Sequence, residues 1–502
     1  PWKSSEKAGS SPMANNNPAG IPIIGVTTIM KRFAAVILSV AAVLFAVCFV
    51  DNAQAAYADN TGAGQEAVQG TAVRKPVRIA ASHAYAVEYS TGRILYDQDG
   101  TKPAGIASMT KIITLYLVYK AIAQGGLTWD TRIHISDYSY RLSRNWETTT
   151  VPMDKRDYTV KQLVTAAFTR SANSAAVSLA EKIAGSEPKF VDQMRTLLKG
   201  WGITDARLYN SSGLNNSYLG DNIYPGSSHD AENMMSARSI AIATWHFMHD
   251  YPDVLEMTKN GTAEFDGMSL KSTNHMLPGQ EDEYSGVDGF KTGTTQIAGE
   301  CFTATAVRNG MRVIAVVQHA DQPQQTASEG RFAAMKDLLD YCFADFSLIV
   351  AVKKDESYNG SYVAVDGGME HRAKAVAVRD FTVCLSAQER KLLSSAGKAS
   401  SAQQTGKKAG ILLFEPLKGT VAAPVAKGMK LGTVSASNAQ GYLGTAGIPS
   451  VDMVAEKGIS QQQHDWWGTA TRAVSRWWGS VVQTVSGWWD SFTRWVSSVW
   501  RR

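Results

Sequence analysis

Cysteine is scarce in this sequence, and neither sign of charge dominates. Four cysteines occur in 502 residues, and the three outside the N-terminal apolar run, Cys301, Cys342 and Cys384, are far apart. An odd number of distant thiols does not indicate a disulfide framework, and no Cys/His group has the spacing of metal ligands. The net charge of +5 is too small to indicate binding to nucleic acid. We therefore expect no metal, no cofactor and no nucleic-acid partner.

One long hydrophobic run is present, near the start of the chain. Residues 33–50 are apolar, follow a Lys-Arg pair and precede an Ala-Gln-Ala tripeptide. A basic start, an apolar core and a cleavage site of small residues are typical of a cleaved secretion signal. We interpret residues 1–55 as an N-terminal extension and signal peptide, with Met13 or Met30 as the true start. An uncleaved membrane-spanning helix is the alternative.

The remaining chain divides by composition and periodicity into four further segments and a tail. The expected segments are a polar linker at 56–79, a catalytic-sized domain at 80–346, a small β-rich domain at 347–455, a linker at 456–465 and a helix at 466–502.

The largest segment has helical patterns enclosed by strand patterns. Expected strands form hairpins within 84–98 and within 287–318, the second around Asn309-Gly310, and helical periodicity covers 108–126, 159–185, 236–252 and 329–346. This order favours an α/β (α+β) domain in which a helical cluster packs on an antiparallel sheet.

The first candidate for chemistry is the motif Ser108-Met109-Thr110-Lys111. Residues three apart share a helix face, so Lys111 is within reach of the Ser108 hydroxyl. Lysine acts as a base only when it is neutral, and burial or a nearby cation lowers its pKa. The motif therefore predicts a second buried lysine. Ser-x-x-Lys also occurs at three polar sites, where a solvated helix or loop is the simpler interpretation.

Two further motifs complete a possible site. Ser171-Ala172-Asn173 lies where two predicted helices meet, so its hydroxyl could relay a proton and its amide could bind a peptide backbone. A helix cap is the alternative. Lys291-Thr292-Gly293 lies on a predicted strand, where the glycine would allow close approach of a ligand and Lys291 would supply the second cation.

Taken together, these three motifs match a known set. Residues 80–346 resemble the serine-type D-alanyl-D-alanine carboxypeptidases, which are low-molecular-mass penicillin-binding proteins, and RSANSAAVSLAE (170–181) is typical of the likeness. Residues 347–455 resemble the β-rich second domain of that family, with APVAKGMKLGTV (423–434) as the clearest piece. The resemblance implies a serine β-lactamase/transpeptidase-like fold, a peptidoglycan stem pentapeptide as substrate and β-lactam antibiotics as covalent inhibitors.

The resemblance also implies roles for the matching residues. Ser108 would attack the carbonyl of the penultimate D-alanine and form an acyl-enzyme. Lys111 would accept the hydroxyl proton, and Ser171 would help to pass it to the departing D-alanine.

Substrate binding would fall to the remaining matched positions. Asn173 would hold the peptide backbone, and Lys291 and Thr292 would bind near the terminal carboxylate. The backbone N–H groups of the nucleophile and of Thr294 would form the oxyanion hole. Arg331 matches an arginine near the carboxylate site.

The tail, residues 466–502, carries a tryptophan pair every eleven residues. Eleven residues are three helical turns plus about 20°, so the pairs share one face and the charged residues lie opposite. The tail contains no apolar run near the ~20 residues that span a bilayer. We predict an amphipathic helix on a membrane surface; a helix packed on a partner or on the domain is the alternative.

These patterns leave three functions open. The first is an exported carboxypeptidase at the outer face of the cytoplasmic membrane, associated with the cell wall. The second is a serine β-lactamase of the same fold, and the third is a catalytically inactive protein that binds the cell wall.

Overall fold

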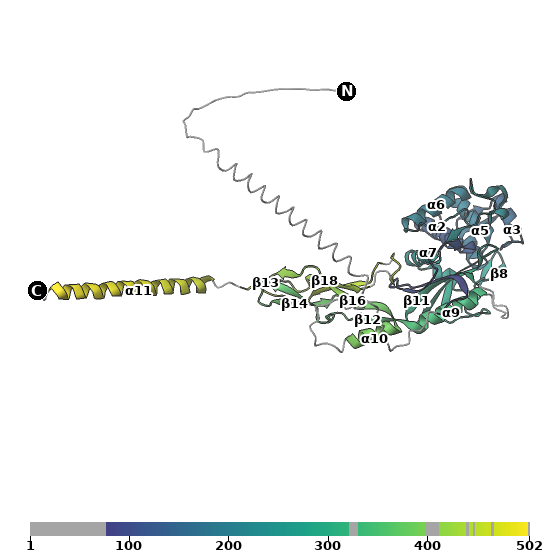
Figure 1. The fold of residues 1–502 in the computed structure, drawn as a ribbon. Helices are drawn as coiled ribbons and strands as arrows, with labels where there is room; N and C mark the ends of the chain where they lie inside the picture. Colours follow the sequence, from purple (N-terminus) through teal and green to yellow (C-terminus); the bar gives the residue numbers. More distant parts are fainter. Residues whose placement is uncertain are drawn as a thin grey trace, which may run out of the picture. The chain divides into compact units, whose positions relative to one another are not determined.

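The computed structural model describes residues 77–320, 330–396, 411–437, 441–444, 447–462 and 466–499 (Figure 1). The predicted signal peptide, nearly all of the predicted linker 56–79 and most of the loop at 394–410 lie outside these ranges.

A five-stranded antiparallel sheet lies at the centre of the region that precedes Phe346, in the order β2-β1-β11-β10-β9. Its strands are β1 (Ala81–Glu88), β2 (Ile94–Gln98), β9 (Val287–Thr295), β10 (Gly299–Arg308) and β11 (Met311–Ala320). Both predicted hairpins are present, and Asn309 and Gly310 have φ of 50° and 77° at the β10–β11 turn. The β-rich run before that turn is two strands, since it folds back at 296–298. This leaves β9 as an edge strand.

Helices cover both faces of this sheet (Figure 1). One face packs in a core with the helical cluster, and the other packs against α9 (Gly330–Asp345). The strand β11 explains how: Ile314 and Val316 belong to the first core, whereas Val313, Ala315 and Val317 belong to the second. Alternate side chains of a strand point to opposite faces, so a strand covered on both faces is apolar throughout.

The helical cluster contains the elements that carry the first two motifs. Its main helices are η1 (Ala107–Thr110), α2 (Lys111–Ala123), α3 (Asp137–Ser143), α4 (Val160–Thr169), α5 (Asn173–Ala184), α6 (Glu187–Gly200), α7 (Ala237–Asp250) and α8 (Val254–Thr258). Short strands and turns connect them: β3 (Ala104–Gly105), β4 (Arg132–His134), β5 (Asp157–Thr159), η2 (Asn216–Tyr218), η3 (Gly220–Asn222), β6 (Met234–Met235), β7 (Thr262–Phe265) and β8 (Met268–Lys271). The two helices expected within 159–185 are α4 and α5, which end and begin on either side of Ser171.

The β-rich region that follows has its own core. A six-stranded sheet runs in the order β16-β18-β19-β14-β13-β17, and β12 pairs with β15. The strands are β12 (Phe346–Val352), β13 (Tyr362–Asp366), β14 (Arg372–Ala377), β15 (Phe381–Ser386), β16 (Leu412–Pro416), β17 (Thr420–Ala422), β18 (Lys430–Ala436) and β19 (Ser450–Ala455). A helix that the strand pattern did not predict, α10 (Ala387–Ala396), follows β15.

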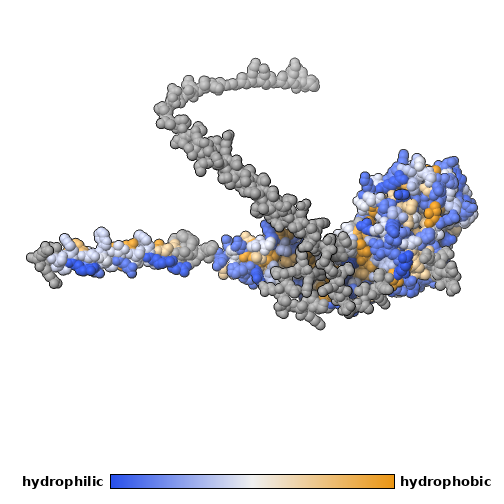
Figure 2. Space-filling model, in the orientation of Figure 1, coloured by the Kyte–Doolittle hydropathy of each residue, from blue (hydrophilic) through white to orange (hydrophobic). Residues whose placement is uncertain are grey.

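The tail forms one long helix, α11 (Trp466–Val499). Its large apolar side chains are exposed, with Trp488 at 80% and Trp489 at 67% of their full accessible surface. Figure 2 shows hydrophilic residues along one side of this helix and apolar ones along the other. Among the described residues, no helix is both long and apolar enough to cross a membrane.

Candidate active site

The candidate nucleophile lies at a strained start of helix α2. Ser108 is in the 3₁₀ turn η1 and is half-buried, whereas the residues around it are buried. Ala107, directly before it, has φ of 45°. This left-handed conformation is unfavourable for a residue with a Cβ and persists only where the surroundings enforce it. The turn therefore holds the Ser108 hydroxyl at a fixed, reachable point.

Lys111 lies under this hydroxyl and is fully buried. Its Nζ is 3.0 Å from Ser108 Oγ, 2.7 Å from Asn173 Oδ1 and 2.7 Å from the carbonyl oxygen of Ser212. An amide oxygen and a carbonyl oxygen can only accept, so two positions on the nitrogen must be N–H bonds. The third position faces Ser108, and in a neutral amine that position is the lone pair. The contacts thus aim a base at the hydroxyl proton.

Lys291 lies on β9, is 1% exposed and contacts a different hydroxyl. Its Nζ donates to Ser171 Oγ at 2.9 Å and to the carbonyl oxygen of Thr292 at 2.9 Å. The Ser-x-x-Lys motif predicted a second buried lysine, and Lys291 is buried. In the structure each motif serine contacts its own lysine: Ser108 contacts Lys111, and Ser171 contacts Lys291.

The two lysines still act on each other through charge. Burial, together with the positive charge of Lys291, holds the pKa of Lys111 well below its usual value of 10.5. Burial, with a smaller contribution from Arg331, lowers the pKa of Lys291 to about 7. Lys111 therefore loses its proton readily, as a general base requires.

The second motif combines a strained backbone at Ser171 with an amide, that of Asn173, which is hydrogen-bonded on both sides. Ser171 has φ of 59° and is 3% exposed, between the end of α4 and the start of α5. Asn173 Nδ2 donates to the carbonyl oxygen of Thr149 at 2.9 Å, while its Oδ1 accepts from Lys111. The amide that was predicted to hold the substrate backbone therefore also orients the lysine.

The third motif packs directly on the nucleophile. A Cβ added at Gly293 would lie 2.9 Å from the carbonyl oxygen of Ile106 and 3.0 Å from the backbone nitrogen of Ser108. The sequence predicted that this glycine admits a ligand backbone. The close approach that the structure shows is to the protein's own turn around Ser108.

Arg331 supports this strand from α9. Its guanidinium donates to the carbonyl oxygen of Gly293 at 2.8 Å and to Thr294 Oγ1 at 2.6 Å, and its Nε lies 3.8 Å from a Glu300 carboxylate oxygen. The side chain is 5% exposed. Arg331 thus adds a buried positive charge next to the Lys-Thr-Gly strand and fixes the Thr294 side chain.

Sequence reasoning missed several groups that complete the site. The carbonyl oxygens of Ser212 and Thr149 orient Lys111 and Asn173, but main-chain atoms leave no signal in residue types. The half-buried Thr273 hydroxyl accepts from Thr292 Oγ1 at 2.7 Å, and the sequence motifs gave this residue no role. In the described part of the chain, no group of three or more His, Cys, Asp or Glu side chains is arranged to hold a metal ion.

A buried lysine beside a serine in a strained turn, next to a Lys-Thr-Gly edge strand, is the arrangement expected of a serine acyl-transfer site with a lysine base. The family model described as D-alanyl-D-alanine carboxypeptidase (Peptidase_S11) matches residues 69–322. The chain belongs to this family, and it is an enzyme with D-alanyl-D-alanine carboxypeptidase activity. This confirms the resemblance and the activity inferred from the motifs. Members of the family act on peptidoglycan, so the protein works on the cell-wall side.

Relatives and solved structures agree with this assignment. The chain is 27% identical over 358 residues to the D-alanyl-D-alanine carboxypeptidase DacF of Bacillus subtilis, covering 70% of this chain and 80% of the relative. It is 25% identical to DacA of Haemophilus influenzae, covering 78% and 89%.

Solved structures with the same architecture include a peptidoglycan synthesis regulatory factor (PBP3) from Streptococcus pneumoniae. That structure has 43% identity and a TM-score of 0.64, and the match covers 76% of this chain and all of the other. Penicillin binding protein 5 from Haemophilus influenzae, with 24% identity and a TM-score of 0.55 over 77% of this chain and 99% of the other, has the same fold. The predicted fold class is thereby confirmed.

Proposed function

We propose that the protein is an exported carboxypeptidase that removes the terminal D-alanine of peptidoglycan stem pentapeptides through an acyl-enzyme on Ser108. The observation that carries this mechanism is the 3.0 Å contact between Ser108 Oγ and the buried Nζ of Lys111. Residues 80–346 would form the catalytic domain and residues 347–455 a second domain.

In the acylation step, Lys111 removes the proton from Ser108 as Oγ bonds to the carbonyl carbon of the penultimate D-alanine. The backbone N–H groups of Ser108 and Thr294 stabilise the oxygen anion that forms; such a donor contributes about 3–4 kcal/mol in other acyl-transfer enzymes. The C–N bond then breaks, and the proton passes through Ser171 to the departing amine.

Substrate would lie along the free edge of β9. Peptides commonly add as a strand to such an edge. Lys291, Thr292 and the neighbouring Thr273 would face the terminal carboxylate, with Arg331 adding positive charge from behind the strand. In the second step, water attacks the ester carbonyl carbon and Lys111 takes a proton from the water. Lys111 then gives that proton to Ser108 Oγ as the bond between Oγ and the carbonyl carbon breaks.

Release of D-alanine from a pentapeptide ending in D-Ala-D-Ala tests this mechanism. The protein should release D-alanine, and Ser108→Ala should release none. Mass spectrometry after benzylpenicillin should find the adduct on Ser108 and no adduct in the variant. An adduct on another residue contradicts the mechanism. Rapid turnover of penicillin instead of a lasting adduct would favour the β-lactamase alternative, and a folded protein with neither activity would favour the wall-binding one.

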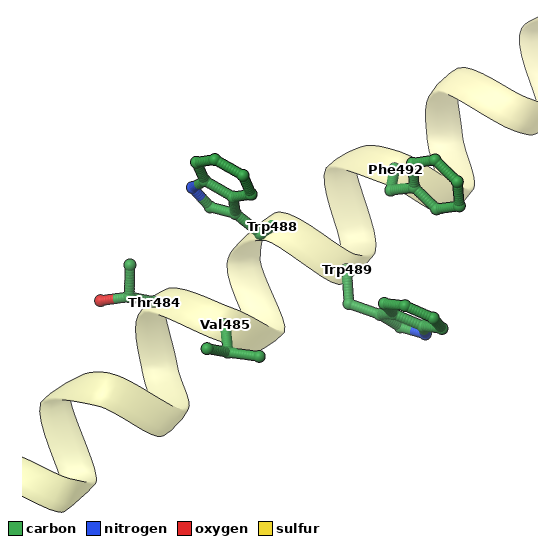
Figure 3. A pocket seen from close by; sticks show the side chains of 5 residues that line it. All are labelled: Thr484, Val485, Trp488, Trp489 and Phe492. Atoms are coloured by element: carbon green, nitrogen blue, oxygen red, sulfur yellow. The ribbon is translucent and has the colours of Figure 1, made fainter.

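We further propose that α11 holds the enzyme on a membrane surface. Val485, Trp488, Trp489 and Phe492 line one apolar hollow on the helix (Figure 3). Tryptophan is favoured at membrane interfaces, and each such ring buries 150–250 Å² when covered, at roughly 25 cal/mol per Å². Arginines on the other side of the helix suit anionic headgroups.

Flotation with lipid vesicles tests the attachment. The full chain should float with vesicles, and a chain cut at about residue 460 should stay behind with its hydrolysis of D-Ala-D-Ala intact. Membrane binding that survives the cut would contradict the proposal, as would tail-mediated dimerisation without lipid.

A further inference from the structure

Glu187 is a buried carboxylate close to the catalytic lysine, and the mechanism above gives it no part. It begins α6 and is 4% exposed. A buried carboxylate without partners is costly, but this one is well supplied with donors. Its Oε1 accepts from the backbone N–H of Ser211 at 2.8 Å and from the Ser211 hydroxyl at 2.6 Å, and its Oε2 accepts from the hydroxyl of Tyr138 at 3.1 Å.

These bonds connect Glu187 to the lysine through two residues. Ser211 is fixed on its other side as well, because its carbonyl oxygen accepts from the Thr114 hydroxyl at 2.6 Å. The next carbonyl along the chain, that of Ser212, accepts from Lys111 Nζ. Holding Ser211 therefore sets the position of an oxygen that decides where the lone pair of Lys111 points.

Glu187 also supplies negative charge where positive charge is crowded. Lys111 faces Lys291 from β9 and Glu187 from α6, and Lys291 faces Arg331 from α9. Glu187 itself faces Tyr138 from α3 and Glu181 from α5. Burial and the charge of Lys291 lower the pKa of Lys111, whereas Glu187 acts in the opposite direction.

We propose that Glu187 is a positioning residue for the base. It holds the Ser211–Ser212 segment under the Lys111 amine, and its charge partly offsets that of Lys291. The inference rests on the proposed function, because it takes Lys111 to be the base. A base is most effective when its pKa lies near the working pH. Burial beside a second cation makes Lys111 easy to deprotonate, but it also makes the neutral amine a weak base. The charge of Glu187 raises the pKa of Lys111 and so restores part of its base strength.

The test is the pH dependence of acylation by a fluorescent penicillin, measured as a second-order rate constant on the full chain in mild detergent. In Glu187→Gln, the amide oxygen can keep both Ser211 bonds, but the charge is gone. The acid limb of the profile should move to lower pH by about 0.5–1 unit. The plateau should fall about two- to threefold, because the base is weaker.

A matched control comes from the neighbouring carboxylate. Glu181 accepts a hydrogen bond from Ser136 and is not among the groups that shift Lys111. The charge of Glu181 raises the pKa of Glu187, so Glu181→Gln keeps Glu187 ionised and should not move the acid limb to lower pH. Tyr138→Phe removes one donor from Glu187 and should move the limb in the same direction as Glu187→Gln, by less. This second variant decides the question if Glu187→Gln does not fold.

Lys111→Ala distinguishes a failure of the proposed function from a failure of the inference about Glu187. If it acylates as fast as the unmodified protein, Lys111 is not the base and the proposed function fails. If it is inactive but the acid limb does not move in Glu187→Gln or in Tyr138→Phe, only the inference about Glu187 is overturned. A limb that moves equally in Glu181→Gln also overturns it, because the effect would then not be specific to Glu187.

Discussion

Replacing Lys291 by methionine should make the protein more stable at neutral pH while removing its activity. The pKa of this lysine is about 7 in the folded protein and 10.5 in an unfolded chain. Between these values the folded state binds fewer protons than the unfolded state, so stability from this group rises with pH. Below pH 7 the folded protein bears the full free-energy cost of burying the charged Lys291. The pKa difference of 3.5 units between 10.5 and about 7 corresponds to roughly 5 kcal/mol.

Methionine fills a similar volume without the buried charge, but it loses the bonds to Ser171 and to the Thr292 carbonyl. Two such hydrogen bonds contribute about 2 kcal/mol together. Lys291→Met should therefore be about 2–3 kcal/mol more stable than the unmodified protein at pH 7. Near pH 10 the penalty is below about 1 kcal/mol, so the advantage should vanish or reverse.

The assay is urea unfolding of both proteins at pH 7, 8, 9 and 10. The quantity of interest is the difference between their free energies of unfolding, since other lysines titrate in both. Lys353→Met, at an exposed lysine, is the matched control and should show a difference that does not vary with pH. A Lys291→Met difference that is likewise constant from pH 7 to 10 would refute the reasoning, because Lys291 would then have an ordinary pKa.

Three further predictions concern single contacts. Gly293→Ala should slow acylation at least tenfold and cost about 1–3 kcal/mol, because the added Cβ presses on the Ser108 backbone; acylation at the normal rate would show that the turn can shift freely. Asn173→Asp should raise the pKa of Lys111 and move the acid limb of acylation up by about 1 unit, and a limb that does not rise would count against this contact. Replacing Trp488 and Trp489 together by alanine should weaken vesicle binding at least tenfold, with hydrolysis unchanged; equal binding would mean that this face does not enter the lipid.

The pairing of Ser108 with Lys111 could be predicted because it is local. Residues three apart share one face of a helical turn, and the contact is 3.0 Å. The contact of Lys291 with Ser171 joins residues 120 positions apart. Spacing along the chain says nothing about such a pair. The need for a second buried cation pointed to Lys291 and the resemblance grouped the three motifs, but neither indicated that Lys291 contacts Ser171.

The strain in the site also left no trace in the sequence. Ala107 and Ser171 both have positive φ, although glycine is the residue that favours this conformation. At Ala107, Gly293 of β9 and Gly213 pack closely against the turn, and such packing exists only in the folded chain. Conversely, the antiparallel sheet and a helical cluster on it could be predicted from periodicity. The apolar run in β11 is typical of a strand buried on both faces, but the coverage of both faces of the sheet by helices was not predicted from the sequence.

Catalysis by the proposed mechanism depends most on the charge of Lys111, and ¹⁵N NMR of lysine-labelled protein measures this charge directly. The Lys111 Nζ resonance can be assigned as the one missing from Lys111→Met. Because the pKa of Lys111 is held well below 10.5, its chemical shift should change to that of a neutral amine at a pH well below that value. A shift that stays at the ammonium value up to pH 9 would contradict the proposed mechanism, because no base would then be available to Ser108.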